Sequence, residues 1–338
     1  MRGVRFRLAL ALLAVFALAE TAPAAAGEAS IRFDLPVACE LGKTCWAVQY
    51  PDVDPGPGVR DFACGERSYR GHEGTDFGVA SLADMRAGVP VIAAADGVVS
   101  RVRDGIPDQY HGAVDGSNGG LDCGNGVVIK HGGDLRTVYC HLRQGSVRVE
   151  PGAWIRRGEP IGLIGMSGRA QFPHVEFAVF REGEMVDPFL GLEPNLDQCG
   201  ISSSGTLWSE QALHAFQYRP SDLYAVGFST SPLETRDVDA GRHVVDGTLD
   251  VNAPALLAWG IAWFVRAGDL LNIRIEDPDG ETLLDHATGI DRSQARRLAY
   301  AGRRQPEGGW LSGTYRATVT LQDRDGVTQS LTTTIDVH

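Results

Sequence analysis

A short run in the middle of the chain places an imidazole and a carboxylate on one side of a predicted β-strand. Residues 172–180 read FPHVEFAVF. Because alternate residues of a strand point the same way, His174 and Glu176 would share one face and the apolar residues between them the other. Both groups can bind zinc or transfer protons, so the pair is either half of a metal site or two polar residues without a chemical role on a half-buried strand.

Two further stretches carry the same residue types. GHEGTDFG contains His72 and Asp76, and TVYCHL contains His141. A catalytic zinc site uses three protein ligands and leaves a fourth position for water, while additional histidines can move a proton or stabilise an oxyanion. Glu73 would point away from His72 on an extended chain, and we interpret it as solvated.

Other residues of these types have ordinary explanations. His111 and Asp115 have a ligand-like spacing but lie in the long polar insertion 104–122, and His131 is interpreted as a turn residue. The remaining histidines are expected to be structural or exposed: His214, His243, His286 and His338. Three tryptophans near the C-terminus are expected in a core: Trp259, Trp263 and Trp310. We find no nucleophile elbow, phosphate loop or dinucleotide fingerprint in the sequence.

The elements that must position these residues are predicted to be strands. Between residues 71 and 190, short apolar stretches such as GNGVVIKH and RTVYCHL are broken by glycine turns, which predicts an all-β sheet domain. Residues 27–70 are predicted to be irregular because they contain PDVDPGPG. The stretch SEQALHAF predicts a short helix within 201–228, a segment we interpret as a linker.

From about residue 229 a second pattern of strands begins. DPDG and DRDG predict hairpin turns, and TYRATVTL alternates apolar with polar residues, as expected of one buried and one wet face. We predict an immunoglobulin-like β-sandwich over 229–338. The whole chain is therefore predicted to be all-β.

The beginning of the chain is typical of a secretory signal. Three arginines precede the apolar run LALALLAVFALA, and Ala24-Ala25-Ala26 forms a small-residue cleavage site. The apolar run is too short to span a bilayer. We predict a signal peptide over 1–26, a first domain over 27–200, a periplasmic or secreted mature protein, and no transmembrane segment in it.

Six cysteines, an even number in an exported chain, favour disulfides over a thiolate metal site. The spacing predicts three pairs: Cys39–Cys45, Cys123–Cys140 and Cys64–Cys199. The first pair encloses the small loop ELGKT, and the second flanks two predicted strands around an HGGD turn. The third pair would join the two ends of the first domain.

The motifs in this order resemble those of lysostaphin-type, LytM-like zinc metallopeptidases, which cleave peptide cross-links in peptidoglycan. The similar stretches are HEGTD, YCHL, GEPIGLIGMSGR before PHVEF, and VDPF, over about residues 60–190. By this resemblance His72 and Asp76 match the first two zinc ligands, and His141 and His174 match the catalytic histidines. The third ligand, a histidine in the family, is Glu176 here.

The departure at Glu176 leaves two hypotheses open. Glutamate can bind zinc, but a second anionic ligand would leave the bound water less acidified than a neutral histidine does. The first hypothesis is an exported zinc metalloendopeptidase acting on peptidoglycan peptides. The second is a degenerate, metal-free module that binds peptidoglycan or regulates a hydrolase, with the C-terminal domain contacting an envelope protein. A formal net charge of −12 does not favour nucleic acid or an anionic membrane surface as a partner.

Overall fold

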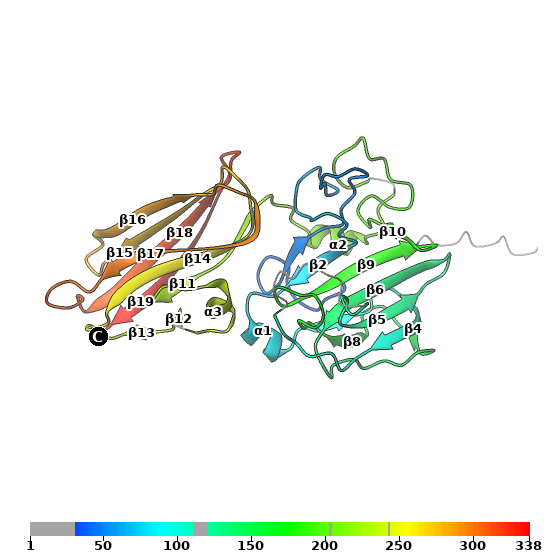
Figure 1. Ribbon diagram of the computed structural model, residues 1–338, viewed down its shortest axis with the longest axis horizontal. Helices are drawn as coiled ribbons and strands as arrows, with labels where there is room; N and C mark the ends of the chain where they lie inside the picture. The colour runs from blue at the N-terminus through cyan, green and yellow to red at the C-terminus, as the bar shows by residue number, and fades with distance from the viewer. Residues whose placement is uncertain (1–30, 111–119, 203–204, 243) are drawn as a thin grey trace, which may run out of the picture. The chain divides into compact units, whose positions relative to one another are not determined.

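The computed structural model describes residues 31–110, 120–202, 205–242 and 244–338, and its regular structure is almost entirely β (Figure 1). The all-β prediction is therefore confirmed. The predicted signal peptide, His111, Asp115 and His243 lie outside the described residues. Within the described part of the chain, no helix is both long enough and apolar enough to cross a membrane.

An eight-stranded antiparallel sheet carries the predicted motifs. Its strands follow the order β1-β2-β9-β6-β5-β4-β7, and β10 pairs with β9 (Figure 1). The bounds are β1 (Trp46–Gln49), β2 (Gly74–Gly78), β4 (Gly97–Arg103), β5 (Asn125–Lys130), β6 (Leu135–Leu142), β7 (Trp154–Ile155), β9 (His174–Arg181) and β10 (Glu184–Val186). Because β2, β9 and β6 are neighbours, HEGTD, PHVEF and YCHL lie side by side.

Alternation along β9 sets which face of this sheet is apolar. Val175, Phe177 and Val179 are fully buried in a hydrophobic core, as the period-two pattern predicts. The opposite face is left for His174 and Glu176. The small sheet of β3 (Pro90–Ile92) and β8 (Pro160–Leu163) also contributes to this hydrophobic core.

Two short elements were not predicted. Strand β1 lies in the segment that was expected to be irregular, and it pairs with β2. Helix α1 (Leu82–Ala87) begins at Ser81, whose hydroxyl accepts a hydrogen bond from the Asp84 backbone N–H. Elements of four and six residues leave too little sequence for a period to show.

The cysteines pair as the spacing predicts. Disulfides join Cys39 to Cys45, Cys64 to Cys199 and Cys123 to Cys140. The last of these crosses the β5–β6 hairpin, whose turn contains the predicted HGGD sequence. This disulfide therefore ties β6, which contains His141, to the segment that precedes β5.

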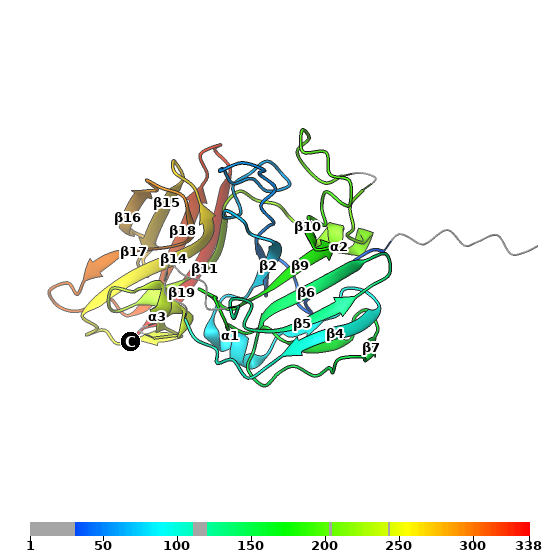
Figure 2. The ribbon, with the colours of Figure 1, turned by 45° about the vertical axis from the view of Figure 1, so that its right-hand side comes forward.

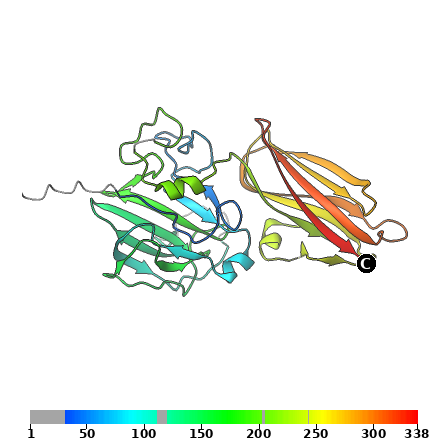
Figure 3. The same cartoon turned by 180° about the vertical axis from the view of Figure 1, so that it is seen from behind.

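Residues 222–337 form two sheets that share one core (Figure 2). The first has the order β12-β11-β14-β17, and the second β13-β19-β18-β15-β16. The bounds are β11 (Asp222–Ser229), β12 (Val244–Val245), β13 (Thr248–Leu249), β14 (Ala255–Val265), β15 (Leu270–Glu276), β16 (Thr282–Gly289), β17 (Gln294–Arg304), β18 (Gly313–Gln322) and β19 (Thr328–Val337). In Figure 3, β19 is the red strand beside β18.

Several local predictions for this part are confirmed. DPDG joins β15 to β16, DRDG joins β18 to β19, and the apolar residues of TYRATVTL are buried. The predicted tryptophans, Trp259, Trp263 and Trp310, are also buried. The immunoglobulin-like assignment of these two sheets remains a prediction.

The segment predicted as a linker contains regular structure. The expected helix is α2 (Glu210–Ala215), capped by Ser209, and α3 (Thr235–Asp239) follows later in the chain. Strand β11 begins at Asp222, inside 201–228, and pairs with β14. The sandwich therefore starts before residue 229, because β11 is held by pairing with a strand more than thirty residues further along the chain.

Candidate functional site

Three neighbouring strands bring the predicted carboxylates together. Asp76 on β2 lies directly across from Glu176 on β9, and Glu176 lies across from Cys140 on β6. Residues directly opposite each other place their side chains on the same face of a sheet. The two carboxylates therefore stand side by side on the face away from the apolar core, and His72, just before β2, joins them.

His141 reaches this face through an unusual backbone conformation. It follows Cys140 directly, so a regular strand would turn its side chain to the other face. Instead its φ is +61°, in the left-handed region that few non-glycine residues adopt. Its backbone N–H donates to the Cys123 carbonyl at 2.8 Å, and its ring Nδ1 bonds the Ser167 carbonyl at 2.8 Å. These contacts hold the imidazole over the carboxylates.

The two histidines predicted to be catalytic are oriented alike. Nδ1 of His174 lies 2.8 Å from the Phe172 carbonyl, as Nδ1 of His141 does from that of Ser167. A carbonyl only accepts hydrogen bonds, so in both rings Nδ1 carries the proton and Nε2 is directed to the carboxylates. Nε2 of His141 is 3.5 Å from Glu176 Oε2, and Nε2 of His174 is 3.7 Å from Asp76 Oδ1.

His72 lies between both carboxylates and is only 1% exposed. Its Nε2 is 3.4 Å from Asp76 Oδ2, and its Nδ1 is 3.7 Å from Glu176 Oε1. Neither nitrogen has a hydrogen-bond partner among the described residues, and the same holds for Asp76 Oδ1. Buried polar atoms without partners are costly, and a cation at this point would satisfy them.

The donor types fit zinc, but their present directions do not meet at one point. Imidazole nitrogens and carboxylate oxygens are the ligands that zinc takes in catalytic sites. Asp76 faces Nε2 of His72, whereas Glu176 faces Nδ1, on another edge of the same ring. Consistent with this, no group of three His, Cys, Asp or Glu side chains in the described residues is arranged as a metal site. Glu176 would have to rotate to join Asp76 on one cation.

Burial and charge push the pKa values of these groups in different directions. Burial lowers the pKa of His174 to about 4, and the nearby Asp76 only partly offsets it. Burial also acts to lower the pKa of His141, but its hydrogen bond and charge interaction with Glu176 outweigh burial and raise it. The pKa of Glu176 falls to about 2, because the histidines outweigh the effect of burial. Glu176 is thus ionised beside the imidazoles of the site.

A groove of about 980 Å³ opens over these residues. Three of its lining residues were not predicted as site residues or were interpreted otherwise. Tyr69 stacks its ring over His72, with centroids 4.3 Å apart, and Arg169 is an exposed cation at the groove. Glu73, interpreted as solvated, is exposed and lines the groove, where burial and then the charge of Glu176 raise its pKa. No periodicity in the sequence marks these loop residues.

One glycine in the first motif is required by the site. A Cβ on Gly74 would lie 2.5 Å from Cγ of Glu176 and 3.0 Å from the Phe177 carbonyl oxygen. Real Cβ atoms essentially never come that close to other heavy atoms. The absent side chain of Gly74 therefore provides the space in which Glu176 lies.

Comparison with known proteins agrees with the motif analysis. Residues 70–188 match the model of Peptidase family M23, which confirms the resemblance to lysostaphin-type, LytM-like peptidases. An uncharacterized metalloprotease of Haemophilus influenzae is 34% identical over 119 residues, which are 35% of this chain and 20% of that protein. The peptidoglycan DD-endopeptidase ShyA of Vibrio cholerae is 34% identical over 116 residues, 34% of this chain and 22% of that protein.

The match is confined to one part of each protein. The DD-carboxypeptidase/endopeptidase Mpg of Neisseria meningitidis is 31% identical over 121 residues, 36% of this chain and 23% of that protein. The chain thus spans less than a quarter of the length of these curated relatives. Among solved structures, the catalytic domain of lysostaphin from Staphylococcus simulans is 20% identical, with a TM-score of 0.27, over 43% of this chain and 89% of that one.

Proposed function

We propose that this protein is an exported, zinc-dependent endopeptidase that cleaves peptide cross-links of peptidoglycan. The observation that carries the proposal is the convergence of His72, Asp76, His141, His174 and Glu176 on one face of the sheet, beneath a groove. Three other observations support it: the match to Peptidase family M23, the peptidoglycan endopeptidases among the relatives, and the secretory signal predicted for residues 1–26.

His72, Asp76 and Glu176 would hold the metal. The unpartnered ring nitrogens of His72 and Oδ1 of Asp76 support this assignment. When bound there, zinc supplies Lewis acidity, which acidifies water and polarises a carbonyl oxygen. Glu176 has the freedom to reorient, since its side chain is 18% exposed and longer than that of Asp76.

His141 and His174 would handle the proton and the developing negative charge. Each fixes its Nδ1 proton on a backbone carbonyl, so each Nε2 points into the groove, where a peptide would lie. One of the two accepts a proton at Nε2 from the attacking water. The other, carrying a proton on Nε2, stabilises the oxyanion that forms at the scissile carbonyl. The groove holds the peptide and orients its carbonyl between them.

One observation favours a second candidate function. In the structure, Glu176 interacts with His72 at 3.7 Å and with His141 at 3.5 Å. A groove satisfied in this way can bind a peptide without cleaving it. The alternative is therefore a degenerate module that binds peptidoglycan or regulates a hydrolase, with the C-terminal sandwich contacting an envelope protein.

Metal content and sacculus cleavage together test the proposal. The mature protein is purified beside Glu176→His, His72→Ala and the control Glu184→Gln, which changes an exposed carboxylate on β10 outside the groove and the ligand set. Zinc is counted by elemental mass spectrometry, and soluble muropeptides released from purified sacculi are quantified.

We expect about one zinc per chain and muropeptide release for the native protein and for Glu184→Gln. His72→Ala should lose both. Sacculus binding without release, with zinc present only in Glu176→His, would instead establish the second candidate. An absence of zinc, release and sacculus binding in all variants would refute both.

A further inference from the structure

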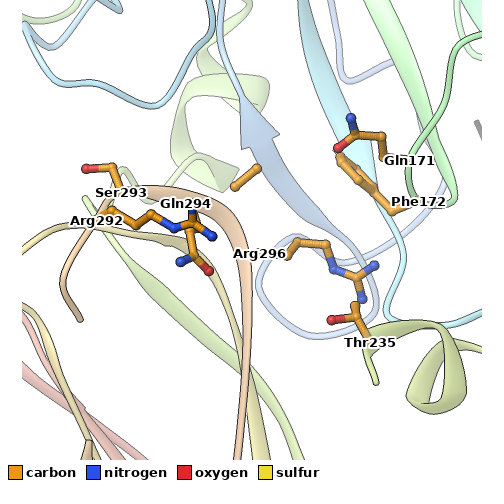
Figure 4. A pocket seen from close by; sticks show the side chains of 8 residues that line it. Gln171, Phe172, Thr235, Arg292, Ser293, Gln294 and Arg296 are labelled. Carbon is orange, nitrogen blue, oxygen red and sulfur yellow. The ribbon is translucent and has the colours of Figure 1, made fainter. Parts of the chain in front are cut away.

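A second pocket adjoins the groove (Figure 4). It has a volume of about 460 Å³, in the range of small-ligand sites. On one side lie Gln171 and Phe172, just before β9. On the other lie Arg292 and Ser293, just before β17, and Gln294, its first residue. All of these except Arg292 also line the groove, so one peptide can occupy both spaces. The Phe172 carbonyl is the group that orients His174.

The wall of this pocket is firmly held. Arg296 donates two hydrogen bonds to the buried Asp239, at 2.6 and 2.9 Å, and others to the Tyr224 hydroxyl. Its guanidinium also lies over the rings of Trp263 and Phe172. Arg296 is therefore neutralised by its own carboxylate and serves to fix the wall rather than to bind a ligand.

Arg292 is the cation left for a ligand. It is exposed, and within the described part of the chain it forms no hydrogen bond or ion pair. Its guanidinium presents a fork of donors that suits a carboxylate. The amides of Gln171 and Gln294 line the same pocket and can donate further hydrogen bonds. The pocket thus offers positive charge and donors in a chain whose net charge is −12.

We propose that this pocket is a subsite for the terminal carboxylate of the peptide held in the groove, with Arg292 as the specificity-determining cation. The inference rests on the proposed function, because it concerns the same peptide. It goes further by assigning part of the recognition to β17 of the sandwich, outside the region 70–188 that matches the peptidase family. A peptide with a free carboxyl end is thereby preferred to one whose end is blocked.

Two probes that differ in a single group test the subsite. One is diacetyl-L-lysyl-D-alanyl-D-alanine, whose only charge is its terminal carboxylate, and the other is its terminal carboxamide. Dissociation constants, or KM values where cleavage occurs, are measured for the native protein, Arg292→Gln and Arg292→Glu. Arg304→Gln, at the other end of β17 and exposed, is the matched control.

The native protein and Arg304→Gln should bind the free acid about tenfold more tightly than the amide, the value of a hydrogen-bonded charge pair at a partly exposed site. Arg292→Gln should remove this preference while leaving amide binding within about twofold, and Arg292→Glu should reverse it. Equal affinity of the native protein for both probes, or equal weakening of both by Arg292→Gln, would overturn the subsite.

Sacculus cleavage by the same variants separates the proposed subsite from the proposed peptidase function. If native cleavage persists without a carboxylate preference, only the subsite fails; if neither cleavage nor binding of either probe occurs, both fail.

Discussion

Replacing Gly74 by alanine perturbs the site through a single carbon atom. The new Cβ would lie 2.5 Å from Cγ of Glu176, inside any tolerable contact, and 3.0 Å from the Phe177 carbonyl oxygen. The backbone at Gly74 is not left-handed, so alanine adds no conformational strain of its own. The loss of stability must therefore come from moving Glu176 and from relieving the close contact with the Phe177 carbonyl oxygen.

The magnitude follows from these two contacts. Overpacking of this kind lowers the free energy of unfolding by about 1–3 kcal/mol. Replacing glycine also reduces the conformational freedom of the unfolded chain, which raises the free energy of unfolding by about 0.4–1 kcal/mol. We expect Gly74→Ala to lower the free energy of unfolding by about 1–2 kcal/mol. Because Glu176 must swing away, we also expect zinc affinity to fall by about 10- to 100-fold, as for other disturbed metal-site supports.

Urea unfolding in chelator, and competition with a chromophoric chelator for zinc, measure the two effects. The control is Gly132→Ala, where an added Cβ meets nothing within 4 Å, so neither quantity should change by more than about 0.5 kcal/mol. The decisive variant adds Glu176→Ala to Gly74→Ala, which removes the clashing atom. The two substitutions should then be non-additive by about 1 kcal/mol or more. Strict additivity would refute the inferred contact between Gly74 and Glu176.

Further predictions concern the supports of the site. Replacing Cys123 and Cys140 by serine should lower the free energy of unfolding by about 3 kcal/mol, from the 17-residue separation they close, and reduce muropeptide release by freeing His141 from its position; urea unfolding and sacculus cleavage check this. Asp239→Ala should cost about 3 kcal/mol by leaving the Arg296 charge buried without its carboxylate, as measured by urea unfolding. Burial raises the pKa of Asp187 from 3.8 to about 7, so between these pH values the folded state holds a proton that the unfolded state releases. The stabilisation that comes from this proton is fully present below pH 4 and is lost as the pH rises to 7. Unfolding at stepped pH should show native stability falling relative to Asp187→Asn by up to about 4 kcal/mol across that window.

The sequence predicts the pairs of the site better than their assembly. His174 and Glu176 share a face because a strand has a period of two, and that period is visible in FPHVEFAVF. The position of His141 is different, since a regular strand would turn it away. Its left-handed backbone is held by carbonyls of Cys123 and Ser167, which come from distant loops. No local pattern encodes such contacts.

The same limit explains the missed start of the sandwich. The residues of β11, DLYAVGFS, include strand-forming side chains but no apolar–polar alternation, and pairing along β14 fixes the strand. The groove residues Tyr69 and Arg169 also lie in loops whose positions depend on tertiary contacts. Hairpins joined by DPDG and DRDG were predictable because a few adjacent residues specify them.

Glu176 affects metal affinity from both sides of the binding equilibrium. If zinc were held there, a second carboxylate ligand would reduce the net positive charge of the site and so weaken its Lewis acidity. In the structure, the same carboxylate interacts with His72 and His141, and an imidazole at position 176 would not provide this negative charge. Binding must first break those interactions, and affinity is the difference between the two states. Glu176→His should therefore strengthen zinc binding even though glutamate is itself a competent ligand, because the substitution removes the carboxylate that interacts with His72, one of the proposed zinc ligands.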